Sequence, residues 1–308
     1  MKKIEFKSML VSIILVLIIY YFYTPALNIH AIEFWIFIIV ALCIYGASTS
    51  YSTLLGKKFK PEKVGYLGVA VAVIVAGILV TDLFTSKIFH ASRYASRIEV
   101  ENVKFNNKTL HEVDFSKTPI IDRKSTVKLG DKVMGEIPEY VSQFEVSDDY
   151  TQISYKNSVY RVTPLEYASF FKYLTNSKNG IPAYITVNST NGKAEIVKLK
   201  DLGLDGMKYV PSAILNHNLN RKLQLTYPTS IFGSPSFEID EKGHPWYVCT
   251  TYTYFGVENK KQVTGAVLFD PITGKSKKYD KDKVPKWVDR VYPEELIMTE
   301  IDENGSLQ

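Results

Sequence analysis

Three apolar stretches, each about as long as a membrane-crossing helix, occupy the N-terminal part of this 308-residue chain. They cover Ser8–Leu27, Ala31–Tyr51 and Val64–Phe84. A helix needs roughly 20 apolar residues to cross the hydrocarbon core of a bilayer, so the sequence predicts three transmembrane helices. No small-x-small cleavage site follows the first stretch and a second stretch comes at once, which favours an uncleaved helix over a signal peptide.

The distribution of lysines predicts the orientation of these helices. Lysines gather before the first stretch and between the second and third, whereas the loop between the first and second has neither Lys nor Arg. These lysines are Lys2, Lys3, Lys7, Lys57, Lys58, Lys60 and Lys63. Because cytoplasmic loops collect Lys and Arg, we expect a cytoplasmic N-terminus and an extracytoplasmic location for everything after Phe84. Lys87, Arg93 and Arg97 oppose this orientation, but long domains translocate largely regardless of charge.

The predicted orientation divides the chain into a three-helix membrane anchor at 1–87, a juxtamembrane connector at 88–118 and an extracytoplasmic domain at 119–308. The connector is expected to begin as a short amphipathic helix, Ser86–Ser96, with Ile88, Phe89 and Tyr94 towards the membrane. No charged residue lies at the centre of a span, and Asp82 lies at the outer end of the third. A transporter is therefore not indicated.

Small residues repeat at four-residue spacing in the third span, at Gly68, Ala72 and Ala76. Such a stripe lets two helices approach closely in lipid. It predicts either a dimer or partner interface, or packing against the first two spans of the same chain. We favour packing within the chain, because three helices joined by short loops must pack against one another.

Beyond the anchor the pattern of apolar residues changes to alternation, which predicts strands. The expected strands are Ile98–Phe105, Leu110–Phe115, the start of Ile120–Met134, Val141–Val146, Thr151–Tyr155 and Ser158–Val162, with turns at Asn106-Asn107 and Leu129–Asp131. Thr163-Pro164-Leu165-Glu166 has the residues of a helix start, with Thr at the N-cap, Pro at the first position and Glu at the third. That helix should end near Asn176, and a second should run from about Pro211 to Leu223.

Hairpins recur in the C-terminal part. Ala183–Lys193 and Gly265–Lys275 both contain an apolar strand, a turn begun by Asn or Asp, a Gly that can adopt positive φ, and a return strand. A third hairpin, Ser236–Val248, turns at Glu241–Gly243. Hairpins interspersed with a few helices predict an α+β domain built on antiparallel sheet.

The segment Leu268–Lys275, a strand followed by Asp-Pro-Ile-Thr-Gly-Lys, resembles the hairpin of PepSY-type modules. Those are small α+β units found outside bacterial membranes, often as inhibitory or sensing attachments. Residues 120–308 also resemble the N-terminal part of large, mostly uncharacterised multi-span membrane proteins of Gram-positive bacteria. The matching segments are Gly180–Val187, Gly206–Tyr209, Tyr227–Thr229, Phe237–Asp240 and Val284–Pro293.

This resemblance implies no known activity and transfers no catalytic residue. Such proteins usually continue well past the length of this chain. The end at Ile301–Gln308 has the composition of a turn without a return strand. We therefore expect a split or a truncated form of the longer protein; in the split form a second polypeptide completes the fold.

Reactive side chains do not form a recognisable site. His217 has no histidine or acidic partner at helical spacing, and no H-E-x-x-H, C-x-x-C, G-x-S-x-G or phosphate-loop motif occurs. His244 follows a turn glycine, and Cys249 lies in an aromatic strand, where we expect a buried small hydrophobe rather than a nucleophile. Cys43 lies in the second span and cannot pair with an extracytoplasmic Cys249. We predict no catalytic residue, no metal and no cofactor.

Three tyrosines interpreted as alternating in one strand, Tyr247, Tyr252 and Tyr254, predict either a binding platform for a ligand or peptide or an ordinary half-exposed sheet face. The second interpretation is favoured because functional patches are rare.

We expect a non-enzymatic, multi-pass protein of the cell envelope whose extracytoplasmic domain binds protein or cell-wall partners. Two alternatives remain: a regulatory or inhibitory subunit of a larger membrane complex, and an envelope hydrolase without a recognisable motif. Membrane lipid is an expected partner. Nucleic acid is not, because the net charge of +5 is concentrated at the membrane boundaries.

Overall fold

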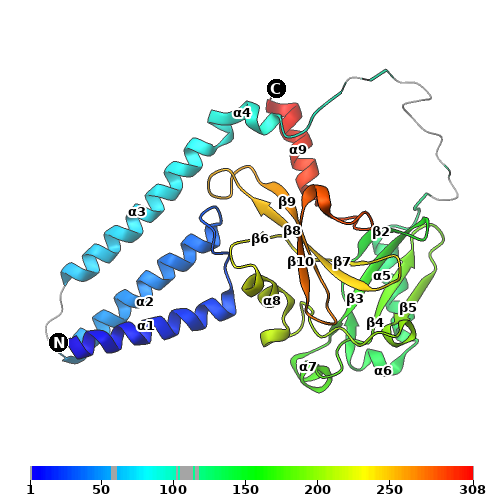
Figure 1. Cartoon of the computed structure of the whole chain (residues 1–308), viewed down its shortest axis with the longest axis horizontal. Coiled ribbons are helices and arrows are strands. Elements are labelled where there is room, and N and C mark those ends of the chain that lie inside the picture. Colours follow the sequence, from blue (N-terminus) through cyan, green and yellow to red (C-terminus); the bar gives the residue numbers. More distant parts are fainter. Residues whose placement is uncertain (1, 57–60, 102, 105–113, 115–117, 308) are drawn as a thin grey trace.

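The computed structural model describes residues 2–56, 61–101, 103–104, 114 and 118–307. Its N-terminal part consists of the helices α1 (Lys2–Tyr23), α2 (Ile32–Gly56) and α3 (Pro61–Thr85). α1 and α2 lie side by side, while α3 diverges from them and runs towards the C-terminal end of the chain (Figure 1). Ile32–Ser50 and Gly65–Thr85 are long and apolar enough to cross a membrane, and the apolar part of α1, Met9–Tyr23, is shorter. Two candidate spans are therefore present, and a third crossing by α1 stays a prediction.

The side chains through which α3 contacts α2 are larger than those of the predicted small-residue stripe. Leu67 lies against Gly46, where an added Cβ would come 3.2 Å from the leucine Cδ1. The half-buried positions of α3 continue along this face at Ala70, Val71, Ile74 and Ile78. Gly68, Ala72 and Ala76 are exposed on another face. The described contact between α3 and α2 therefore does not involve these small residues, and the packing role expected for them stays a prediction.

The connector begins with the predicted amphipathic helix, α4 (Lys87–Ala95), flanked by Ser86 and Ser96 and kinked at His90. Ile88 and Phe89 are exposed as expected. Tyr94 is buried, because it packs against the protein and its hydroxyl donates to the Thr85 carbonyl at 2.8 Å. Residues 98–101 and 103–104 form no strand, contrary to expectation. The predicted turn and the return strand after it lie outside the described residues, except for position 114.

The first antiparallel sheet contains β1 (Phe144–Val146), β2 (Thr151–Tyr155), β3 (Ser158–Tyr167), β4 (Ala183–Asn188) and β5 (Ala194–Lys198). β3 is long enough to pair with β4 on one side and with β2 and then β1 on the other. The helices α5 (Arg123–Gly135), α6 (Pro138–Val141) and α7 (Phe170–Asn176) accompany this sheet. β2 matches its prediction, and β4–β5 confirms the first hairpin.

The second antiparallel sheet contains β6 (Ile231–Phe232), β7 (Ser236–Ile239), β8 (Pro245–Thr253), β9 (Gln262–Phe269) and β10 (Ser276–Asp280). The pairs β7–β8 and β9–β10 confirm the other two predicted hairpins. The helix α8 (Leu219–Thr226) precedes this sheet and α9 (Glu294–Leu307) follows it. α9 occupies the segment in which the sequence predicted a terminal turn. Short 3-10 helices cover Leu199–Leu202, Leu215–His217 and Lys281–Lys283.

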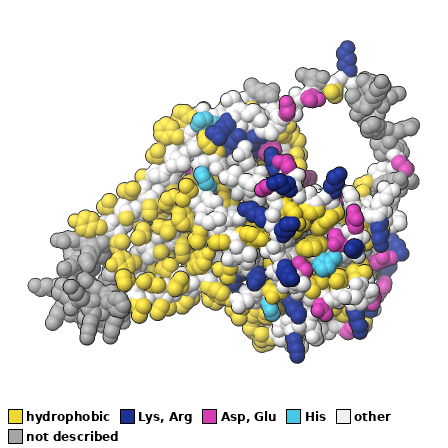
Figure 2. Space-filling model, viewed as in Figure 1, with side chains coloured by type: hydrophobic (Ala, Val, Ile, Leu, Met, Phe, Trp, Pro, Cys, Tyr) yellow, Lys and Arg dark blue, Asp and Glu magenta, His cyan; other side chains and the backbone are white. Residues whose placement is uncertain are grey.

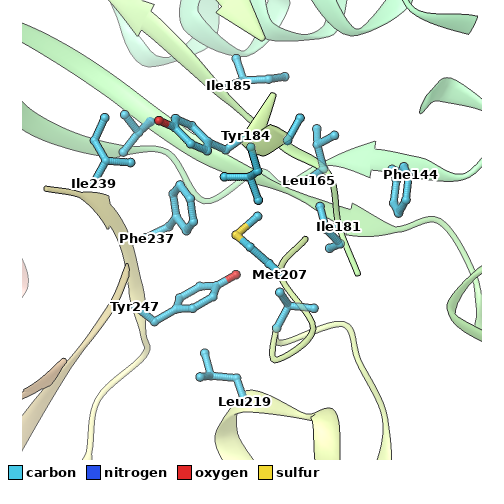
Figure 3. Packing of buried hydrophobic residues seen from close by; sticks show 14 of the residues in the cluster. Phe144, Leu165, Ile181, Tyr184, Ile185, Met207, Leu219, Phe237, Ile239 and Tyr247 are labelled. Carbon is cyan, nitrogen blue, oxygen red and sulfur yellow. The ribbon is translucent and has the colours of Figure 1, made fainter. Parts of the chain in front are cut away.

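One hydrophobic core joins the two sheets. Tyr184 of β4 meets Phe237 of β7 at a ring-centroid distance of 5.7 Å, and Phe237 meets Tyr247 of β8 at 5.5 Å (Figure 3). Met207 and Leu219 fill the space beside these rings, and both are completely buried. Full burial of each such side chain contributes about 1.5–3 kcal/mol, so the two sheets stabilise each other. This arrangement confirms an α+β fold with antiparallel sheets.

Two predicted elements change type in the structure. Thr163–Tyr167 continues β3 instead of starting a helix, because β4 pairs with Thr163 and Pro164 and β1 pairs with Leu165–Tyr167. The helix α7 begins after Ser169, whose Oγ accepts from the Lys172 N–H. Residues 123–135 form α5, a continuous helix in place of the turn predicted at Leu129–Asp131. Asp122 caps the start of this helix by accepting from the Ser125 N–H at 2.6 Å.

Candidate functional site at the junction of helices and sheets

The side chains of His217, His244 and Cys249 are held by packing and polar contacts within the fold. Tyr173 and Tyr209 contact His217, whose Nδ1 lies 3.1 Å from the Tyr173 hydroxyl. The Nε2 atom of His244 lies 3.5 Å from Asp270 Oδ1 in the turn of the next hairpin. Cys249 is completely buried, as predicted, and burial raises the pKa of its thiol. Within the described residues, no group of three or more His, Cys, Asp or Glu side chains could hold a metal ion.

The three tyrosines of the predicted interaction face lie in different surroundings. Tyr247 points into the core between the sheets (Figure 3). Tyr252 is also buried, after a β-bulge at Thr251/Tyr252 that changes the register of β8. Tyr254 lies beyond the end of β8 and is half-buried. These residues therefore do not form one exposed face, and the bulge explains why alternation along the sequence did not locate them correctly.

Tyr252 and Tyr254 instead help to join the sheet domain to the N-terminal apolar helices. They belong to a small hydrophobic cluster with Ala26 and Ala31 from the α1–α2 loop and Leu296 from α9. Ile231, Val263 and Val291 complete this cluster. The residues come from parts of the chain far apart in sequence, which is why no local pattern predicted the contact.

The α1–α2 loop is hydrogen-bonded to the second sheet and its neighbours. The Leu27 N–H donates to the Pro228 carbonyl at 2.7 Å, and His30 Nδ1 lies 2.7 Å from the Gly256 carbonyl. At the end of α1, Arg221 of α8 donates from Nε to the Tyr21 carbonyl at 2.8 Å and places its guanidinium 4.9 Å from the Tyr21 ring centre. These contacts fix the ends of two helices on one side of the domain.

The end of α3 is held by the β8–β9 loop. The Asn259 side-chain amide donates to the Asp82 carbonyl at 3.0 Å and to Thr85 Oγ1 at 2.8 Å. Gly256 adopts φ +83°, and a Cβ there would come 2.9 Å from the Thr85 Cβ. Glycine is therefore required at this position by both the backbone conformation and the close approach of α3.

α4 and α9 are joined by a buried ionic cluster. The Arg97 side chain is only 3% exposed and contacts Glu303, which is 6% exposed, and Glu300 at 3.4 Å. Lys87 Nζ lies 2.7 Å from Glu303 Oε1, and Arg97 also donates to the Lys261 carbonyl at 2.9 Å. Removing one partner from such a buried cluster typically costs about 3–5 kcal/mol, because the other charge remains buried and unpaired.

A cavity of about 620 Å³ lies between α4, α9 and the β8–β9 loop, where the chain leaves α3. Its lining includes Lys87, Arg97, Lys260 and Lys261 together with Tyr252. Burial, reinforced by the charges of nearby arginines, lowers the pKa of Lys260. Lys261 lies over the Tyr252 ring at 3.9 Å. Because Glu258, Glu295 and Glu303 also line it, the cavity carries charges of both signs close to the end of an apolar helix. Figure 2 shows the change from the apolar helices to a charged domain surface.

This junction was not predicted from the sequence. Its local signals were weak: the adjacent lysines Lys260 and Lys261, and Glu300 and Glu303 at a spacing that places both on one face of α9. The site combines lysine and arginine side chains with carboxylates and an aromatic ring.

The chain matches no family model, and neither a curated protein nor a solved structure matches it significantly. The resemblance to PepSY-type hairpins and to multi-span proteins of Gram-positive bacteria accordingly stays a prediction.

Proposed function

We propose that this chain is a membrane-anchored, non-catalytic protein of the cell envelope that presents its sheet domain to a protein or cell-wall partner. The observation that carries the proposal is the junction: Leu27, Asn259 and Arg97 tie the α1–α2 loop, α3 and α4 to the domain at separate points. Such attachment gives the domain a fixed height and orientation relative to the apolar helices. A binding or regulatory protein benefits from this fixed presentation.

Exposed apolar side chains on α7 support a protein as the partner. Phe170, Phe171 and Leu174 are 54%, 74% and 52% exposed, and the two phenylalanine rings contact each other edge to face. α7 lies at one end of the domain, away from α3 and α4 (Figure 1). Exposed aromatic groups of this kind are enriched in protein interfaces. We expect Phe171→Ser to reduce crosslinking of the chain to its partner in intact membranes and Lys242→Ala to leave it unchanged.

The proposed orientation is tested by labelling with a membrane-impermeant maleimide. A Lys242→Cys substitution in a Cys43→Ser background places a thiol in the exposed β7–β8 turn, while Cys249 stays buried and unreactive. Intact cells should label the variant as fully as lysed cells do. Labelling only after lysis would place the domain in the cytoplasm, and complete extraction of the chain by alkaline carbonate would exclude membrane anchoring.

A second candidate function, as a subunit of a larger membrane complex, is favoured by the exposed small-residue face of α3. An added Cβ at Gly68 would meet nothing within 4 Å, and Ala72 and Ala76 are exposed beside it. Small residues on a lipid-facing surface permit another helix to pack closely. Crosslinking from Ala72→Cys in native membranes should capture one stoichiometric helical neighbour. Val73→Cys, also exposed, is the matched control, and equal capture from both positions would count against a specific interface.

A further inference from the structure

The strand β10 forms one edge of the second sheet, and its outer side is unpaired. In the order β10–β9–β8–β6 it has a neighbouring strand on one side alone. The Asp270 N–H donates to the Lys275 carbonyl at 2.8 Å where the β9–β10 hairpin turns. Because backbone bonds alternate along an antiparallel pair, the peptide groups of Ser276, Lys278 and Asp280 point away from β9. Within the described part of the chain, their N–H groups have no backbone hydrogen-bond partner.

The described neighbours of β10 cover its two faces and leave this edge accessible. Tyr279 packs with Trp287 in a hydrophobic cluster on one face. On the other face, Lys278 Nζ donates to Ser230 Oγ at 3.0 Å. Lys278 and Asp280 are exposed, so a second chain can reach their outward peptide groups. An edge strand in this position is a template for pairing with another strand.

The edge is strongly basic. Residues 275–286 contain six lysines and two aspartates, and so carry four more positive than negative charges. Asp280 pairs with Lys283 at 3.0 Å. Two carboxylates of adjoining segments are engaged elsewhere: Asp270 accepts from the Thr273 hydroxyl and Asp289 from the Ser154 N–H, both at 2.7 Å. All six lysines are exposed: Lys275, Lys277, Lys278, Lys281, Lys283 and Lys286.

This charge determines which strand can pair with β10. Two copies of the edge would place lysines opposite lysines, and like charges that face each other across strands are destabilising. A strand with acidic side chains would instead place carboxylates opposite lysines. Lys277 and Lys278 point to opposite faces of the sheet, because successive side chains of a strand alternate. An added strand can therefore carry its carboxylates on either face.

We propose that β10 accepts an extended, acidic segment of a partner protein as an additional strand of the second sheet. The outward peptide groups of Ser276, Lys278 and Asp280 would bind the backbone of this segment, and Lys277 and Lys278 would face its carboxylates. The inference rests on the proposed function, in which the domain binds a protein, and it adds the chemistry of the bound segment. An anionic polymer without a peptide backbone would contact the lysines but would leave the outward N–H groups without a partner strand.

The test uses the full chain in detergent and a fluorescein-labelled peptide of alternating glutamate and threonine, with binding measured by fluorescence anisotropy. Lys278→Pro removes an outward N–H but no bond to β9, and proline is tolerated on the outer side of an edge strand. Lys278→Ala is the matched control, since it removes the same charge and keeps the N–H. We expect Lys278→Pro to bind the peptide about tenfold more weakly than Lys278→Ala, because it loses a backbone bond and its ring obstructs pairing. Equal binding by the two variants would overturn the proposal.

A charge-reversal variant tests the proposal even if the proline variant does not fold. Lys277→Glu/Lys281→Glu should bind the glutamate peptide about tenfold more weakly than the wild type does, and a lysine–threonine peptide more tightly. Lys242→Ala, in the exposed β7–β8 turn, is the control and should bind both peptides as the wild type does. The glutamate peptide methylated at every backbone nitrogen keeps its charges but cannot pair as a strand. Binding of this peptide as tight as that of the unmodified one would assign the contact to charge alone and overturn the proposal.

Crosslinking to the native partner in intact membranes separates this inference from the proposed function. If Phe171→Ser reduces crosslinking but Lys278→Pro and Lys278→Ala crosslink equally, the domain binds its protein partner elsewhere and β10 is not the site. If the wild type captures no protein while peptide binding is weakened by Lys278→Pro as expected, the proposed function fails and the pairing edge stands.

Discussion

One buried carboxylate, that of Glu238, makes the stability of the sheet domain depend on pH. Glu238 of β7 is completely buried and accepts hydrogen bonds from the N–H groups of Asp289 and Arg290 at 2.9 and 3.0 Å. It thereby holds the segment that leads from β10 to α9. Burial raises the pKa of Glu238 from 4.5 to about 7, although the two N–H donors oppose the shift.

The sign of the effect follows from proton binding. Between pH 4.5 and 7 the folded protein binds more protons at Glu238 than the unfolded chain does, so stability falls as pH rises. At about 1.4 kcal/mol per pKa unit, the loss is about 3 kcal/mol by pH 8. We expect Glu238→Gln to remove this part of the pH dependence. Urea unfolding followed by tryptophan fluorescence at pH 5 and pH 8 measures it, and parallel profiles for both proteins would contradict the assignment.

Arg97 is the residue on which the α4–α9 contact depends. Arg97→Met would leave Glu300 and Glu303 buried without their guanidinium partner, at a cost of about 3–5 kcal/mol. Glu300→Gln should cost less, because Glu300 is the more exposed of the two carboxylates and makes the longer contact. Limited proteolysis of the full chain should release α9 from Arg97→Met much faster than from Glu300→Gln. Similar release from both would show that the cluster is not the main restraint.

At the scale of elements, the sequence predicted hairpins better than it predicted helices. A hairpin is a local unit, and the Asx-started turns with glycine at positive φ, such as Asp270–Gly274, carry their own signal. The helix predicted at Thr163 failed for a non-local reason: the same residues complete a strand once β4 and β1 are in place. The junction could not be predicted at all, since its contacts join residues about 200 positions apart, as in Arg221 with Tyr21.

The β8–β9 loop should be the most sensitive element of the junction. Gly256→Ala adds a methyl group that meets Thr85 of α3 at a position with φ +83°. Gly203→Ala is the matched control, because φ there is +72° but nothing lies within 4 Å of the added Cβ. We expect a loss of about 1 kcal/mol in the control and about 2–3 kcal/mol in Gly256→Ala. Hydrogen exchange should accelerate at Asp82–Thr85 only in Gly256→Ala, and acceleration in both would contradict the contact.

For the whole molecule, the junction also accounts for the basic residues that oppose the predicted orientation. Lys87 and Arg97 pair with Glu303, and Arg93 stacks on Phe255. Their positions are set by the fold of the domain rather than by a free membrane-flanking loop, which is the setting in which the positive-inside rule operates.

Fixed docking of the domain on the helices predicts a specific crosslink. The backbones of Leu27 and Pro228 are hydrogen-bonded at 2.7 Å, so cysteines at these positions should be joined by a short bismaleimide in a Cys43→Ser background. Glu195→Cys, on β5 at the opposite side of the domain, replaces the Pro228 cysteine in the control (Figure 1). We expect efficient crosslinking of the first pair in native membranes and none of the second. If the domain moved freely about the connector, both pairs would react slowly and to a similar extent, because no single orientation would be held.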